Sequence, residues 1–327
     1  MREKILQNIH IAKESRSYID CLYSLLSSAG MFDLPKYMLY GMTGMAFKFS
    51  IHKRMLPSSL DLYDWRWENW RAVNVLGIYN ETYSGSPLDS TFHIYQKNMI
   101  LKIKQSIDAG KAVIGWGPSK SSFCLILGYS DADQVLFFKH SSSKENEVLL
   151  YDNWGITDEG DWFLQIIGQL AEKDIRDIYR ESMEIAINEW HSDYKTNFGY
   201  GSGRKAYHNL INALKTGSFD ERGAYYILDA YINAKRDISK YMHQVSIEIP
   251  ALLDAAKLYK KLAETYCHIR SIPVTGKPNE DIQYIPQAIC LFQEAMQIEE
   301  QAISEIEKYM AEIIYNKRIN PVRLKSL

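Results

Sequence analysis

The first residue whose type and position suggest chemistry is Cys21. Apolar residues recur around it at helical spacing and predict a short helix over residues 17–29, ending at Gly30. Ser17 or Asp20 is the expected cap of this helix. Cys21 then lies in the first turn, where free backbone N–H groups and the helix dipole lower the pKa of a thiol. Cys21 is therefore either a nucleophile or a small buried apolar residue, the commonest state of a free cysteine.

The other candidates for metal or cofactor chemistry are weak. The four cysteines are scattered without C-x-x-C spacing, which argues against structural zinc and against a disulfide framework: Cys21, Cys124, Cys267 and Cys290. The glycine-rich stretch 199–203 precedes a helix but lacks the full phosphate-loop pattern, so we interpret it as a turn between helices. We expect no metal and no cofactor.

The stretch from Ile100 to Gly155 supplies the framework that would position Cys21. A helix over residues 90–109 ends at Gly110. Short apolar runs divided by Gly, Ser, Asp and Asn then predict an antiparallel meander of four strands, at Lys111–Trp116, Ser122–Tyr129, Val135–Phe138 and Val148–Tyr151. Trp162–Ile167 is a candidate for a fifth strand. A sheet needs a cover on at least one face, and the helix that carries Cys21 is the natural one.

After about residue 168 the pattern is helical throughout. Amphipathic runs predict helices near residues 175–187, 207–214, 221–245, 250–269 and 286–316, with a loop at Pro273, Gly276 and Pro278. We therefore expect an α+β fold in which an antiparallel sheet packs on an N-terminal helix that bears a cysteine, followed by a mostly helical second half. The expected domains are residues 1–168 and 169–327.

Composition excludes several classes of function. The net charge of −2 leaves no electrostatic footprint for nucleic acid. No apolar run approaches the roughly 20 residues that a membrane-spanning helix needs, and the first residues lack the apolar core of a signal peptide. We expect a cytoplasmic protein with no membrane partner. The oligomeric state does not follow from the sequence.

Residues 63–70 contain three tryptophans at spacings of two and three, Trp65, Trp67 and Trp70. One helical face can hold Trp67 and Trp70, which leaves Trp65 elsewhere. Packing between domains and a ligand-stacking box are the two interpretations of this cluster, and we favour packing.

Four stretches together resemble papain-like cysteine domains, and more narrowly the family of the butirosin biosynthesis protein H N-terminal domain: Tyr18–Leu26, Gly110–Trp116, Phe123–Tyr129 and Tyr151–Asp152. The helical half also resembles the region that follows this domain in the family, around Tyr200–Gly201, Ala206–Tyr207 and Ala255–Ala256. The family is related to bacterial peptidases that trim leader peptides. The resemblance implies a papain-like fold and a role in peptide or secondary-metabolite biosynthesis.

The resemblance also implies roles for three residues. In active members a cysteine attacks an acyl carbonyl, a histidine at the start of the second strand acts as base, and an acidic or amide residue orients it. Cys21 matches the nucleophile and Asp152 the orienting residue, but Ser122 occupies the histidine position. A serine hydroxyl does not accept a proton near neutral pH as imidazole does. We expect the three side chains to meet at one edge of the meander.

Three hypotheses remain. The first is a degenerate papain-like domain that binds a peptide, an acyl carrier or a small metabolite in the ancestral cleft. The second is an active thiol acyltransferase or amide hydrolase that uses Cys21 with a non-standard base, for which His52, His93 and His140 are candidates. The third is a protein-interaction module built from the helical half.

Overall fold

The computed structural model describes residues 2–14, 16–117, 120–143, 145–157, 160–193, 198–272 and 284–319, with side chains up to residue 313. The chain divides into two compact units, which we describe separately. The sheet unit comprises Met1–Leu39 and Asp64–Lys173, and the helical unit comprises Tyr40–Tyr63 and Asp174–Leu327. The loop expected at Pro273, Gly276 and Pro278 lies outside the described residues.

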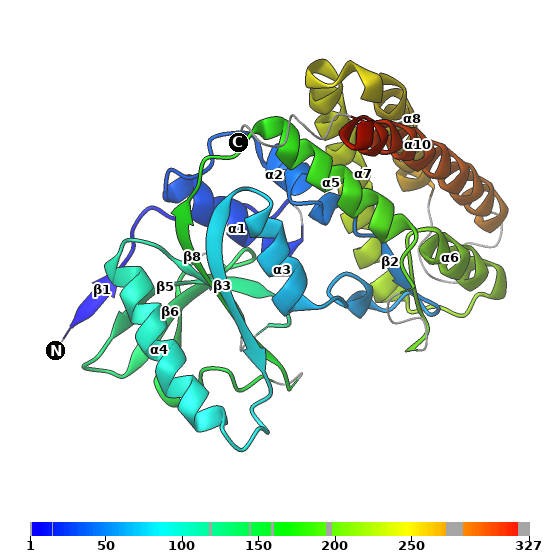
Figure 1. The fold of residues 1–327 in the computed structure, drawn as a ribbon. Helices are drawn as coiled ribbons and strands as arrows, with labels where there is room; N and C mark the ends of the chain where they lie inside the picture. Colours follow the sequence, from blue (N-terminus) through cyan, green and yellow to red (C-terminus); the bar gives the residue numbers. More distant parts are fainter. Residues whose placement is uncertain are drawn as a thin grey trace. The chain divides into compact units, whose positions relative to one another are not determined.

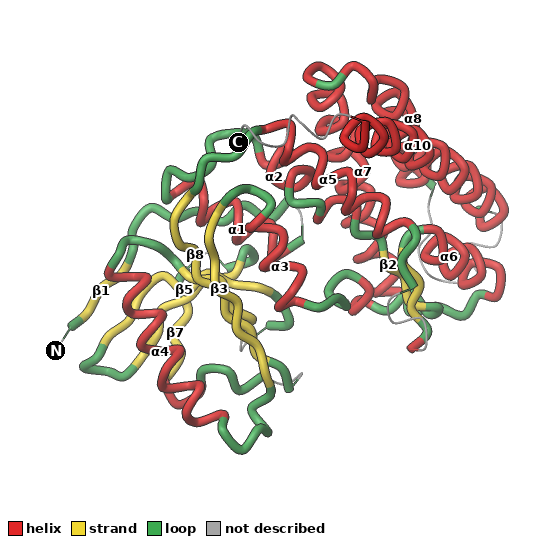
Figure 2. Tube along the Cα trace, viewed as in Figure 1, coloured by secondary structure: helices red, strands yellow, loops and turns green. Residues whose placement is uncertain are grey.

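The sheet unit is built on a seven-stranded antiparallel sheet (Figures 1 and 2). Its strands are β1 (Glu3–Ile5), β3 (Ile78–Gly85), β4 (Val113–Trp116), β5 (Phe123–Ser130), β6 (Val135–His140), β7 (Glu147–Leu150) and β8 (Trp162–Leu170). The order across the sheet is β3-β8-β4-β5-β6-β7, and β1 pairs with the end of β5. The four expected strands are β4 to β7, and they form the expected meander.

Helices cover both faces of this sheet. Helix α4 (Phe92–Asp108) lies on one face, where Met99, Ile103 and Ile107 join a core that includes Cys124 and Leu164. Helices α1 (Ser17–Ser28) and α3 (Trp65–Asn74) lie on the other face, because Tyr18 and Trp65 pack edge-on against Phe123 of β5. Alternation along the strands produces this division, since neighbouring residues of a strand point to opposite faces.

The helical unit contains α5 (Ile175–Trp190), α6 (Arg204–Thr216), α7 (Glu221–Glu248), α8 (Leu253–Ser271) and α10 (Ile285–Ile319). A two-stranded sheet of β2 (Ser50–His52) and β9 (Tyr200–Ser202) ties residues 40–63 to it. Phe49 lies against the rings of Tyr207 and Tyr231, with centroids 4.6 and 4.7 Å away. Helix α2 (Lys36–Met42) contains the point where the chain passes from one unit to the other.

The structure confirms the expected fold class, an α+β chain with an antiparallel sheet and a helical C-terminal half. It differs from the expectation in detail. Residues 40–63 lie inside the expected first domain, 1–168, but belong to the helical unit, because their aromatic side chains are buried among its helices. The structure adds β3, and it places β8 between β3 and β4. In the described part of the chain, no helix is long and apolar enough to cross a membrane.

Candidate functional site

The start of helix α1 lies against the start of strand β5. Arg16 is the extended N-cap residue and Ser17 is the first residue of the helix. The backbone N–H of Phe123 donates a hydrogen bond of 3.2 Å to the Ser17 hydroxyl oxygen. A nucleophile at the start of this helix would therefore sit at position 17, next to Ser122, and that position holds a serine. Ser17 and Ser122 are both half-buried.

Cys21 lies one turn further along, as the fifth residue of α1, and is fully buried. Burial raises the pKa of its thiol well above the ordinary value, and the nearby Cys124 and Asp20 raise it further, against a smaller lowering by Lys36. The helix-start effect expected to lower this pKa is thus outweighed by desolvation. Among the described residues, no imidazole hydrogen-bonds to the Cys21 sulfur. Cys21 is placed as a core residue.

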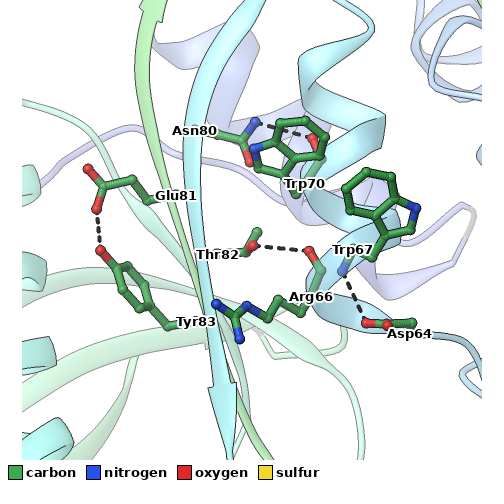
Figure 3. Close-up of a pocket in the computed structure, with 8 residues that line it drawn as sticks. All are labelled: Asp64, Arg66, Trp67, Trp70, Asn80, Glu81, Thr82 and Tyr83. Atoms are coloured by element: carbon green, nitrogen blue, oxygen red, sulfur yellow. Dashed lines mark hydrogen bonds between the residues drawn. The ribbon is translucent and has the colours of Figure 1, made fainter.

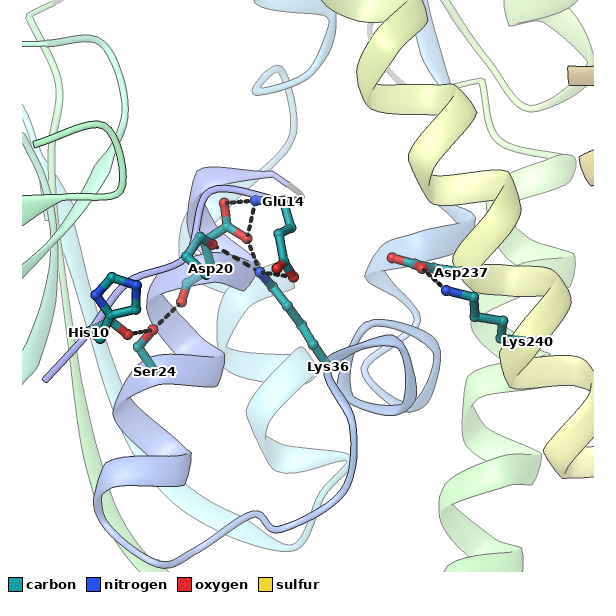
Figure 4. Close-up of polar contacts among 8 residues, drawn as sticks. His10, Glu14, Asp20, Ser24, Lys36, Asp237 and Lys240 are labelled. Atoms are coloured by element: carbon teal, nitrogen blue, oxygen red, sulfur yellow. Dashed lines mark hydrogen bonds and ion pairs between the residues drawn. The ribbon is translucent and has the colours of Figure 1, made fainter. Parts of the chain in front are cut away.

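A buried ion pair fixes this part of α1 (Figure 4). The Asp20 side chain is fully buried and lies 2.6 Å from the Lys36 ammonium group. Asp20 also accepts a hydrogen bond from the backbone N–H of Glu14, and Ser24 donates to the backbone carbonyl of His10. Asp20 therefore anchors the preceding segment and α2 to the helix rather than capping the helix start. Its negative charge beside Cys21 further disfavours a thiolate.

Ser122, which occupies the histidine position of the expected site, has a histidine as its hydrogen-bond partner. The Ser122 hydroxyl lies 3.0 Å from Nδ1 of His140, the last residue of β6. His140 is buried, and desolvation lowers its pKa; the Glu147 carboxylate opposes this effect and Lys120 adds to it. The imidazole is therefore neutral near pH 7 and able to accept a proton.

Glycine at position 117 lets the His140 ring pack there. A Cβ atom at Gly117 would lie 2.0 Å from Cε1 of His140. Glu147, at the start of β7, stands beside this pair and accepts hydrogen bonds from Ser143 and Lys120. Ser122, His140 and Glu147 thus form a polar cluster at one end of the sheet, and sequence reasoning did not link them. The sequence could have predicted this contact, because in an antiparallel pair the end of β6 lies beside the start of β5.

Asp152 does not belong to this cluster. It follows β7 at the opposite end of the sheet, because Leu150 of β7 pairs with Val135, the first residue of β6, whereas His140 is the last. Five residue steps along a strand correspond to about 17 Å. The expectation that Cys21, Ser122 and Asp152 meet at one edge is therefore wrong. The exposed Asp152 offers its backbone carbonyl to Gln96.

The other two histidines considered as bases also lie elsewhere in the fold. His93 is exposed near the start of α4. His52 is in β2 of the helical unit, where Nδ1 accepts a hydrogen bond from the backbone N–H of Arg54. Within the described ranges, no group of three His, Cys, Asp or Glu side chains is arranged to hold a metal ion.

Comparison of the chain with models of known protein families returns no match. Comparison with curated proteins returns no significant match.

Proposed function

We propose that the sheet unit is a non-catalytic relative of papain-like cysteine domains, similar to the butirosin biosynthesis protein H N-terminal family. In this proposal it binds a peptide, an acyl carrier or a small metabolite in the cytoplasm, in peptide or secondary-metabolite biosynthesis. One observation carries the proposal: the only cysteine of α1 is fully buried with a raised pKa, while the start of the helix holds Ser17. A thiol that stays protonated and out of contact with solvent is a poor nucleophile.

Trapping an acyl-enzyme tests this proposal. The full chain is incubated with an N-acetylcysteamine thioester and with p-nitrophenyl acetate, and its peptides are analysed by mass spectrometry. We expect no acyl group on Cys21 and equal ester turnover by the wild type and by Cys21→Ala. An acyl adduct on Cys21, with loss of turnover in Cys21→Ala, would refute the non-catalytic assignment.

The Ser122–His140 pair favours a second candidate, a serine hydrolase. A neutral imidazole 3.0 Å from a half-buried hydroxyl is a nucleophile–base arrangement. In such a reaction the Ser122 oxygen bonds to the acyl carbon while its proton passes to His140. The bond between that carbon and the leaving group then breaks, the leaving group takes the proton from His140, and water hydrolyses the acyl-serine. A fluorophosphonate probe distinguishes this candidate: labelling of Ser122 that is lost in His140→Gln supports it. If Ser122 stays unlabelled while a control serine hydrolase reacts, this candidate fails.

A further inference from the structure

A groove runs between helix α3 and the outer edge of strand β3 in the sheet unit (Figure 3). It has a volume of about 460 Å³, within the range of ligand sites in proteins. Its walls come from the tryptophan cluster of residues 63–70 and from the middle of β3. Neither the papain-like resemblance nor the Ser122 cluster accounts for this groove, which is separated from Ser122 by strands β8 and β4.

Strand β3 forms an edge of the sheet. Among the described residues it pairs with β8 on one side and with no strand on the other. An edge strand presents a row of backbone N–H and C=O groups that another extended chain can pair with. Helix α3 does not replace that partner: Thr82 and Asn80 reach it through their side chains, which donate to the backbone carbonyls of Arg66 and Trp70.

The helix side of the groove presents aromatic surface. The Trp67 and Trp70 rings are stacked, with centroids 5.1 Å apart and planes inclined by 25°. The Trp67 side is open, since 53% of this residue is exposed. Large apolar side chains left in solvent beside a groove mark surfaces that bind a partner. Asp64 holds the tryptophans in place because its carboxylate caps the helix at the backbone N–H of Trp67, 3.0 Å away.

The charges of the groove leave one cation available. Glu81 is engaged by Lys102 at 2.8 Å and by the Tyr83 hydroxyl, and these bonds lower the pKa of its carboxyl. The Asp64 carboxylate is used as the helix cap. Within the described residues, the exposed Arg66 guanidinium has no hydrogen bond or ion pair, and in Figure 3 it extends across β3 toward Tyr83. Arg66 is therefore the group of the groove that can pair with a carboxylate of a ligand.

We propose that the β3 edge binds an extended acidic peptide, which adds a strand to the sheet. Backbone hydrogen bonds to β3 hold the peptide, apolar side chains lie on Trp67 and Trp70, and a carboxylate pairs with Arg66. The proposal rests on the binding role proposed above for the sheet unit and selects a peptide from the ligand classes named there. The occupant is extended because β3 offers a strand edge, and acidic because Arg66 is the charge left unpaired.

Fluorescence anisotropy with defined peptides tests the proposal on the full chain. The probe is a fluorescein-labelled peptide of eight residues, the length of β3, in which Val alternates with Glu. One matched peptide carries Lys in place of Glu, and another carries N-methyl groups at alternate amides. We expect the acidic peptide to bind, the Lys peptide to bind about tenfold more weakly or worse, and N-methylation to abolish binding because it removes backbone donors.

Protein variants separate charge and stacking. Arg66→Glu should reverse the preference between the acidic and the Lys peptide, and Trp67→Ala should weaken binding of both. Arg222→Glu, a matched change at an exposed position of the helical unit, should leave binding unchanged. Circular dichroism of each variant establishes that it is folded.

Four results of the binding measurements would overturn the proposal. Three of them are no binding of the acidic peptide, equal binding of the N-methylated peptide, and an unchanged preference in Arg66→Glu. The fourth is full displacement of the peptide by naphthalene-2-carboxylate, an aromatic anion that has no backbone to pair with β3. Concentration-dependent dimerisation that Trp67→Ala removes would instead identify a second copy of the chain as the occupant, and would also overturn it. The proposed absence of thiol catalysis stands or falls separately, on acyl transfer to Cys21.

Discussion

One helical turn separates the two residues on which the functional assignment depends. Ser17 begins α1 and contacts β5, whereas Cys21 faces the interior. The sequence predicts this helix and its glycine stop well, because the apolar spacing is a local property. It does not show which residue of the helix meets the sheet, since that depends on the Phe123 N–H, which lies about a hundred residues further along. The sequence therefore predicted the helix but left Cys21 open between a nucleophile and a buried apolar residue, and the structure places it in the core.

At the residue scale, His140 should make the stability of the sheet unit depend on pH. Burial lowers its pKa below the ordinary value of 6.5, so the unfolded chain binds more protons when the pH falls below that value. Stability is then complete above about pH 6.5 and decreases as the pH falls toward the pKa of the folded state. Urea unfolding of the wild type at pH 5 and pH 7.5 measures the effect.

The matched control is His140→Gln, which keeps a hydrogen-bonding side chain beside Ser122 but does not titrate there. Its loss of stability between the two pH values should be smaller than that of the wild type. His52, whose pKa is also lowered by burial, contributes equally to both proteins. If the two proteins lose the same stability, the imidazole is not buried as described.

At the element scale, the direction of the strands decides which residues can meet. In an antiparallel meander neighbouring strands run in opposite directions, so the start of β5 and the end of β7 lie at opposite ends of the strands. Ser122 and Asp152 therefore cannot meet. This consequence was already contained in the predicted strand order. The position of β8 could not be predicted in this way, because its pairing with β3 joins segments whose residues lie about eighty positions apart. Such nonlocal pairing is set by tertiary packing rather than by local pattern.

The core of the helical unit contains a buried ion pair in addition to its apolar side chains. Lys235 of α7 pairs with Glu299 of α10, and both side chains are almost fully buried. Tyr207 of α6 donates a hydrogen bond of 2.6 Å to the same carboxylate, and Tyr266 of α8 bonds to Tyr207 at 3.1 Å. Four helices thus converge on one charge pair, and removal of one partner leaves an uncompensated charge in the core.

We expect Lys235→Met to lower the free energy of unfolding by about 3–5 kcal/mol, the usual cost of breaking a buried pair. The double variant Lys235→Met/Glu299→Gln should recover much of this loss, because it removes the orphaned charge and keeps an acceptor for Tyr207. Urea titration of the three proteins measures both steps. A single variant as stable as the wild type, or a double variant no better than the single one, would contradict this description.

At the scale of the whole molecule, the helical unit is assembled from two separate stretches of the chain. The expected boundary near residue 168 lies close to the end of the sheet unit at Lys173. Composition alone could not assign residues 40–63, because Met, Gly and aromatic residues suit a pocket wall and a core equally well. Their assignment became clear only through contacts such as those of Phe49 with Tyr207 and Tyr231.

A fragment of residues 174–327 should therefore fold poorly, since it lacks Phe49 and the β2 partner of β9. We expect it to show little cooperative thermal unfolding by circular dichroism. Addition of a peptide of residues 40–63 should restore a cooperative transition, and the same peptide with Phe49→Ala should restore less. A fragment that unfolds at the temperature of the full chain without the peptide would show that residues 40–63 are dispensable.

The central claim is that Cys21 is a buried core residue and that the start of the helix lies at position 17. The most direct test compares thiols at these two positions in one sample. The variant Ser17→Cys is treated with iodoacetamide near neutral pH, and the modified peptides are quantified by mass spectrometry, with the exposed Cys267 as an internal standard. We expect rapid modification at position 17, where the thiol is half-exposed at the helix start, and no modification of Cys21 until the chain is unfolded. Modification of folded Cys21 faster than Cys267 would contradict the account.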